Sequence, residues 1–253
     1  MELVSGTADD GRGQLAGRFQ AVIFDLFGTL VENFSRSEYQ EVLAAMATVL
    51  GVSADDFART WMETFRERTT RGSKRTEDDI ELMCAHLGLE VGNDAVGTVA
   101  EMRRDFTRRQ MVPRGGALET LTKLREMVLK LGLITDCTVE VPQLWPETAF
   151  GPLFDVAVFS CIECIKKPDA AIYHRACDRL GVEPAQCLYV GDGSSQELTG
   201  AARAGLCPLW LAVPAEDDPD VHRVDAEEWT GPKVTALAEV LALVQEGLRA
   251  RTA

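Results

Sequence analysis

Short apolar runs alternate with longer amphipathic segments, and this alternation constrains the fold of the chain more than any other feature. The run Ala21–Phe24 is apolar at every position, which is typical of a parallel strand covered on both faces. Four further apolar runs follow it, at Leu131–Thr135, Val156–Phe159, Cys187–Val190 and Pro208–Ala212. Because strands that alternate with helices need right-handed crossovers, the pattern predicts an α/β fold with a mostly parallel sheet.

Helical periodicity fills the segments between these runs. Apolar residues recur at helical spacing in Ala117–Lys130, Ala170–Leu180, Gln196–Ala204 and Lys233–Arg249. Glycines follow the second and third of these segments directly, where a glycine commonly ends a helix. We therefore expect a helix at each of the four segments.

The stretch from about residue 31 to residue 111 shows helical patterns only, over 38–50, 54–68, 77–87 and 94–109. A helical block inserted directly after the first strand would lie over the carboxyl ends of the strands, where open α/β sheets bind ligands. The sequence thus predicts a core of residues 18–31 plus 112–253, an all-helical cap over 32–111, and a flexible leader over 1–17.

Charge and composition exclude several classes of function. The 253 residues carry a net charge of −14, which argues against a nucleic-acid partner because phosphate neutralisation needs clustered cations. No stretch approaches the roughly 20 apolar residues of a membrane helix, and residues 1–17 lack the apolar centre of a secretory signal. The seven cysteines are scattered and odd in number, which favours reduced thiols and a cytoplasmic location.

Two of the cysteines, Cys161 and Cys164, form a lone C-x-x-C motif. A zinc site of this type needs a second pair, which is missing, and a redox motif needs a helix that begins at the motif. We expect these thiols to have no role in catalysis.

Polar side chains stand where the predicted strands end. Asp25, Thr135 and Asp192 each close a strand, and Lys167 lies in the connection that follows another. The carboxyl ends of parallel strands share one edge of the sheet, so these side chains should converge there. Two carboxylates suit Mg²⁺, and a hydroxyl and an ammonium suit the oxygens of an anion.

These positions carry four motifs that resemble those of the haloacid dehalogenase (HAD) superfamily of hydrolases. The segments are D-L-F-G-T-L from Asp25, L-I-T ending at Thr135, K-P-D from Lys167, and G-D-G-S-S-Q-E-L around Asp192. They occur in the order of the family and span most of the predicted core. The resemblance implies the HAD fold, with a Rossmann-like core and an inserted helical cap, and a small phosphate ester as substrate.

The resemblance also implies roles for individual residues. Asp25 would be the covalent nucleophile, Thr135 would bind the transferred group, and Lys167 would balance charge. Asp136, which would stand in the substrate-binding region, replaces the asparagine often found there and adds a negative charge beside the anion site.

The same resemblance supplies a metal site. Mg²⁺ would be held by Asp25, by the backbone carbonyl of Phe27 and by Asp192. Glu197 stands where the family places a second acid, and it would bind the ion directly or through water.

Phe27 departs from the family pattern, because most HAD phosphatases carry there an aspartate that protonates the leaving alcohol. Three interpretations follow. The protein could be a Mg²⁺-dependent phosphatase of reduced or specialised activity. It could be a metal-free 2-haloacid dehalogenase, since these enzymes carry an aromatic residue at this position and halide leaves without a proton. It could also be a phosphoanion-binding or regulatory protein that has lost turnover.

Helical spacing predicts which side chains of the cap face solvent and which are buried. A group of arginines is expected to face solvent, namely Arg103, Arg104, Arg108 and Arg109. A group of aromatic residues is expected in the core of the cap, namely Trp61, Phe65 and Phe106.

Overall fold

The computed structural model describes residues 19–213 and 229–250, so the predicted leader lies outside the described residues. Within these ranges the chain forms a six-stranded parallel sheet with the order β3-β2-β1-β4-β5-β6. The strands are β1 (Ala21–Phe24), β2 (Lys130–Thr135), β3 (Val156–Phe159), β4 (Cys187–Gly191), β5 (Cys207–Leu211) and β6 (Lys233–Val234).

Strand β1 lies at the centre of the sheet, where the strand order changes direction. Phe24 is in register with Leu133 of β2 on one side and with Val190 of β4 on the other. The residue after β1 is therefore placed beside the ends of both neighbouring strands. This switch point is where open α/β sheets form their ligand crevice.

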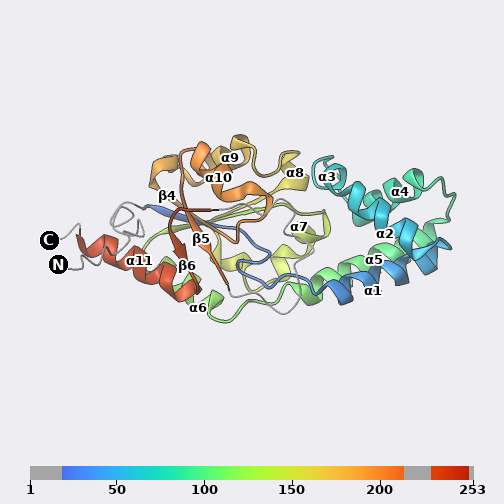
Figure 1. Cartoon of the computed structure of the whole chain (residues 1–253), viewed down its shortest axis with the longest axis horizontal. Helices are drawn as coiled ribbons and strands as arrows, with labels where there is room; N and C mark the ends of the chain where they lie inside the picture. The colour runs from blue at the N-terminus through green and yellow to red at the C-terminus, as the bar shows by residue number, and fades with distance from the viewer. Residues whose placement is uncertain (1–18, 214–228, 251–253) are drawn as a thin grey trace, which may run out of the picture.

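Helices cover both faces of the sheet. Figure 1 shows α6 (Ala117–Glu126) and α11 (Leu237–Ala250) on one face, and α9 (Ala170–Leu180) and α10 (Glu197–Arg203) on the other. Successive residues of β1 point to opposite faces, so Val22 and Phe24 join one hydrophobic cluster while Ala21 and Ile23 join the other. Every residue of β1 is fully buried, as the continuous apolar run predicts, and the α/β fold class is confirmed.

Short elements connect the strands to these helices. They are the α-helices α7 (Glu140–Leu144) and α8 (Ser160–Glu163), and the 3₁₀ helices η2 (Trp145–Glu147), η3 (Gly151–Leu153), η4 (Pro184–Gln186) and η5 (Ser194–Gln196).

Five helices between β1 and α6 form a bundle beside the sheet, which we call the helical cap (Figure 1). They are α1 (Arg36–Leu50), α2 (Ala54–Glu63), α3 (Phe65–Arg68), α4 (Thr76–His86) and α5 (Asn93–Gln110). Ser35 and Ser53 cap α1 and α2 by accepting backbone N–H groups, and Gly51 ends α1 in the left-handed conformation. The inward faces of these helices pack into a hydrophobic cluster of their own.

Three expected helices differ from those observed. The helix over 54–68 is divided at Thr64, whose hydroxyl donates to the Thr60 carbonyl and whose backbone belongs to neither helix. Lys130, expected at a helix end, is the first residue of β2. The helix over 233–249 begins only at Leu237, because Lys233 and Val234 pair with β5. No helix in the described part of the chain is both long enough and apolar enough to cross a bilayer.

Candidate active site

Asp25 follows β1 directly and is almost completely buried at the carboxyl edge of the sheet. Its Oδ1 atom accepts a hydrogen bond from Lys167 Nζ at 2.5 Å, and the same ammonium donates to Glu197 Oε2 at 2.6 Å. All three side chains are at most 4% exposed. Residues that are 142 positions apart in the chain thus form one buried ionic network.

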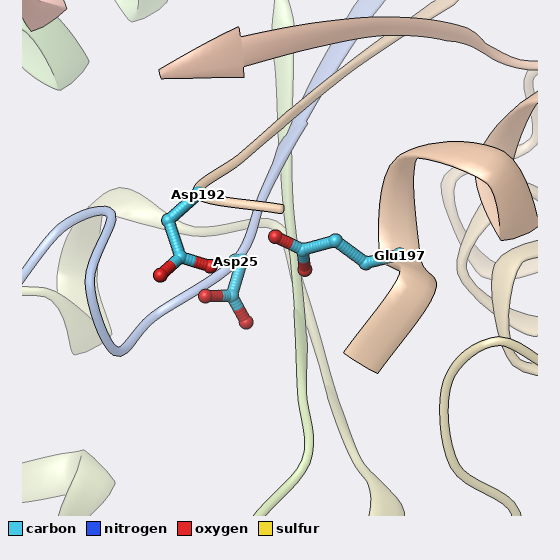
Figure 2. Close-up of side chains that lie close together, drawn as sticks. All are labelled: Asp25, Asp192 and Glu197. Atoms are coloured by element: carbon cyan, nitrogen blue, oxygen red, sulfur yellow. The ribbon is translucent and has the colours of Figure 1, made fainter. Parts of the chain in front are cut away.

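Three carboxylates converge in this network, as Figure 2 shows for Asp25, Asp192 and Glu197. One oxygen from each lies within 4.8 Å of the others. Two glycines make room for them: a Cβ on Gly28 would lie 2.3 Å from Asp192 Oδ2, and a Cβ on Gly191 would lie 2.2 Å from Glu197 Oε1. The close approach of backbone and carboxylate therefore requires glycine at both positions.

Burial shifts the pKa values of these groups. Burial raises the pKa of Asp25 to about 6, helped by the charge of Asp192 and opposed by Lys167. Burial also raises the pKa of Glu197 well above its ordinary value. For Lys167, burial acts to lower the pKa, but Asp25 and Glu197 outweigh it and the pKa is raised. Lys167 is therefore a permanent cation at neutral pH.

A divalent cation fits this donor set. Three buried carboxylates lie together and the Lys167 ammonium pairs with two of them, so a dipositive ion would offset negative charge that remains in the cluster. Carboxylate oxygens are the ligands that Mg²⁺ prefers. Glu197 also has other partners: Oε2 accepts a hydrogen bond from the Tyr189 hydroxyl at 2.7 Å, and Oε1 accepts one from the Gly193 backbone N–H at 3.0 Å.

Thr135 and Asp136 lie beside the network at the end of β2. The hydroxyl of Thr135 is buried and has no hydrogen-bond partner among the described residues, although it borders a cavity. Asp136 accepts the backbone N–H of Lys167 at 3.0 Å and lies 3.3 Å from Lys166 Nζ. One backbone hydrogen bond and one ion pair thus hold the extra negative charge of Asp136, and the unsatisfied hydroxyl of Thr135 is left for a ligand.

The cavity lies between the sheet edge and the helical cap and has a volume of about 90 Å³. Phe27 lines it on the core side, and its ring contacts the ring of Phe34 with centroids 4.9 Å apart. Phe27 also packs against the hydrophobic clusters of both core and cap. The position where an acid would face the leaving group is therefore occupied by an apolar contact between the two parts.

The expectations for the side chains of the cap are correct for some residues and wrong for others. Trp61 and Phe106 are buried in the cap cluster, as expected, but Phe65 is only half-buried and lines the cavity. Arg108 and Arg109 are exposed, and Arg104 is half-buried with ion pairs to Glu77 and Glu101. The expectation for Arg103 is wrong, because it is buried and donates to Glu140 Oε1 at 2.6 Å.

Arg68 is a second buried arginine at the cavity, and sequence reasoning missed it. Its position carried a signal, since it follows Trp61 by seven residues and so falls on the same helical face. Arg103 likewise lies between Val99 and Phe106, on the apolar face of α5. A cation on the buried face of an amphipathic helix would have identified both residues.

All seven cysteines are free thiols. In the C-x-x-C motif, Cys161 is buried and Cys164 is exposed. The Cys161 sulfur lies 3.9 Å from that of Cys137, a residue outside the motif.

Comparison with known proteins gives one family. The sequence model of the haloacid dehalogenase-like hydrolases matches residues 19–205. The (S)-2-haloacid dehalogenase of Pseudomonas putida is 26% identical over 209 residues, which cover 76% of this chain and 84% of that protein. The glyceraldehyde 3-phosphate phosphatase of Methanopyrus kandleri is 26% identical over 193 residues, which cover 74% of this chain and 81% of that protein.

A solved structure has the same fold. The HAD phosphatase from Thermococcus onnurineus is similar with a TM-score of 0.62 and 22% sequence identity, covering 89% of this chain and 97% of that chain. At this identity the likeness shows the fold alone. The sequence relatives include both a dehalogenase and a phosphatase, so the reaction has to be argued from the site.

Proposed function

Because the chain belongs to the haloacid dehalogenase-like hydrolases, we propose that it is a Mg²⁺-dependent phosphatase of a small phosphate ester. The observation that carries this proposal is the buried cluster of Asp25, Asp192 and Glu197 around Lys167. Three carboxylates held together away from water repel one another, and a divalent cation would offset that repulsion.

The proposed reaction has two steps. A carboxylate oxygen of Asp25 attacks the phosphorus atom, the phosphorus–oxygen bond of the ester breaks, and the alkoxide leaves with the bonding electrons and takes up a proton to become the alcohol. Water then attacks the phosphorus of the aspartyl-phosphate, which releases inorganic phosphate and restores the carboxylate. The Thr135 hydroxyl would donate to a phosphoryl oxygen, and Lys167 would hold Asp25 in place and offset the negative charge.

We propose that Asp25, the Phe27 carbonyl and Asp192 hold Mg²⁺, and that Glu197 supports the ion through water because both of its oxygens already accept hydrogen bonds. The ion supplies charge stabilisation for the transferred phosphoryl group. Residues 32–111 would act as a lid on a core of residues 18–31 and 112–253, since the cavity lies between them. Asp136 would bind substrate indirectly, by positioning the backbone of Lys167.

Phe27 gives this phosphatase a particular selectivity. The phenyl ring cannot protonate a leaving alkoxide or activate water, so both proton transfers rely on solvent or on the substrate. Esters with good leaving groups need the least help. We therefore propose that the rate falls steeply as the leaving group becomes more basic.

A 2-haloacid dehalogenase is the second candidate, and Phe27 is the observation that favours it. In that reaction the Asp25 carboxylate would attack the carbon that bears the halogen, and the halide would leave without a proton. An aromatic side chain beside Asp25 suits the departure of halide better than the departure of an alcohol. The carboxylate cluster outweighs this argument, because halide displacement gains nothing from a metal site.

One assay separates the two reactions. Phosphate release would be measured on a panel of small esters with and without Mg²⁺, and halide release on chlorinated and fluorinated 2-haloacids, for the wild type and Asp25→Asn. We expect phosphate release that needs Mg²⁺ and that falls about 10⁴-fold or more in the variant. Halide release without metal, with no turnover of any ester, would overturn the proposal. Inertness in both assays, together with measurable binding of phosphate or metal, would favour a binding protein.

A further inference from the structure

Arg68, the last residue of α3, is 1% exposed and lines the cavity that contains Asp25. Its guanidinium lies over the Trp61 ring, 3.6 Å from the centroid, and donates from Nη2 to the Trp61 carbonyl at 2.6 Å and from Nε to Thr64 Oγ1 at 3.3 Å. Both acceptors are neutral, so these hydrogen bonds do not compensate its charge. Asp79 and Glu140 act on it through space, but neither forms an ion pair with it.

Arg103 approaches the same cavity from α5 and is 5% exposed. It is paired with Glu140 through Nε, while its Nη1 atom is buried and has no hydrogen-bond partner within residues 19–213 and 229–250. An unsatisfied guanidinium N–H away from water is rare in native proteins and needs an explanation. A ligand that enters the cavity would provide the missing acceptor.

Arg68 and Arg103 are close enough for the charge of Arg103 to destabilise the protonated form of Arg68. Burial lowers the pKa of Arg68 to about 10, and the charge of Arg103 lowers it further. Both guanidinium groups are still protonated at neutral pH. Each cation lies near aromatic rings, Trp61 for both and Phe106 for Arg103, so little solvent screens their charge. The unfavourable free energy of two buried like charges falls when an anion lies between the arginines.

We propose that Arg68 and Arg103 form a second anion subsite, which binds a carboxylate of the substrate while the Asp25 end of the cavity binds its phosphoryl group. This inference rests on the proposed phosphatase function only for the identity of the group at Asp25. A guanidinium offers a planar pair of donors that matches a carboxylate. The substrate class is then the phosphate esters of small hydroxy acids, because a cavity of about 90 Å³ is small beside the roughly 300–1,000 Å³ of sites that hold larger ligands.

The test compares matched esters in the full-length protein. The phosphate esters of two- and three-carbon hydroxy acids would be assayed against the phosphate esters of the corresponding diols, with Mg²⁺ present. The measured quantity is the ratio of kcat/KM for the acid ester to that for the diol ester. We expect a wild-type ratio of about 10 or more, and a fall of about tenfold or more in Arg68→Gln, because the variant loses a charge-assisted hydrogen bond to the carboxylate.

Arg66→Gln is the matched control. Arg66 lies two residues earlier in the same helix, is exposed and does not border the cavity, so the same loss of charge should leave the ratio unchanged. Arg68→Lys keeps the charge but loses the planar pair of donors, and should give an intermediate ratio. A wild-type ratio of one or less, or an unchanged ratio in Arg68→Gln, would overturn the subsite.

A binding measurement separates failure of the subsite from failure of the proposed function. Calorimetric affinities would be measured for 3-phosphonopropionate, whose phosphorus–carbon bond is not hydrolysed, and for propylphosphonate, which lacks the carboxylate. Tighter binding of the first, lost in Arg68→Gln, supports the subsite even if no ester is turned over. Equal affinities, or equal loss of both affinities together with a lower Tm in the variant, would show that Arg68 is structural.

Discussion

The ammonium of Lys167 lies 2.5 Å from the carboxylate of Asp25, and both groups are almost completely buried. In the sequence the two residues are 142 positions apart: Asp25 follows strand β1, and Lys167 lies in the connection between α8 and α9. Their contact fixes the direction in which Asp25 faces the cavity. Lys167 is also bonded to Glu197, so one cation orients two of the three clustered carboxylates.

Replacing Lys167 by Met should lower the free energy of unfolding by about 3–5 kcal/mol at pH 7.5 without metal, because the buried carboxylates of Asp25 and Glu197 lose the ammonium that pairs with both. The loss should shrink toward pH 5.5, since the raised pKa values of Asp25 and Glu197 allow these groups to take up protons. Urea denaturation measures both effects. Lys166→Met is the control, because the partly exposed pair with Asp136 should contribute less than about 1 kcal/mol. Similar losses for the two variants would contradict the role of Lys167.

Mg²⁺ should stabilise the folded protein, because the unfolded chain does not hold the three carboxylates together. At a concentration of 100 times Kd, the free energy of unfolding should rise by about 2.7 kcal/mol. Differential scanning calorimetry with and without Mg²⁺ measures the change. Asp192→Asn should remove most of it, whereas Asp178→Asn, an exposed change on α9, should keep it. A wild-type Tm that does not respond to Mg²⁺ would remove the metal from the mechanism.

Introducing the missing acid through Phe27→Asp should raise kcat for esters with basic leaving groups by about tenfold or more, since general acid catalysis contributes about 10²–10⁴-fold. The gain should be small for p-nitrophenyl phosphate, whose leaving group needs no proton. The variant should also be less stable than the wild type, because it loses the contact between Phe27 and Phe34. An unchanged dependence on the leaving group, with both rates measured at saturating substrate, would mean that proton transfer does not limit turnover.

Asp79 in the helical cap is buried, and one of its oxygens has no hydrogen-bond partner. Burial raises its pKa from 3.8 to about 6. The folded state therefore disfavours the charged form of Asp79. Its contribution lowers the free energy of unfolding as the pH rises from about 4 to about 6, and it has no such effect below about 4. Asp79→Asn should raise the free energy of unfolding at pH 8 by about 1–3 kcal/mol.

The rise in the free energy of unfolding caused by Asp79→Asn should be smaller at pH 5 than at pH 8, as measured by urea denaturation at both pH values. Glu81→Gln, on the exposed side of the same helix, provides the matched control and should change stability little at either pH. A gain for Asp79→Asn that is the same at both pH values would show that its charge is not the cause.

The strands of the core could be predicted from the sequence because each is marked by a local run of apolar residues. A parallel strand covered on both faces must be apolar at successive positions, and β1 to β5 each contain such a run. Strand β6 could not be predicted in this way, because two residues show no periodicity and only their pairing with β5 defines the strand. The division of the 54–68 helix at Thr64 depends in the same way on packing within the cap.

By itself, the sequence determined which residues stand at the ends of the strands, and so which carboxylates, hydroxyl and ammonium share one sheet edge. Tertiary structure alone decided that Glu197 is bonded to Lys167 and Tyr189, and that Arg68 and Arg103 lie in the same cavity as Asp25. The physical reason is the range of the interactions. Helix and strand patterns follow from residues a few positions apart, whereas the direction of a buried charge follows from elements that meet only when the cap packs on the core.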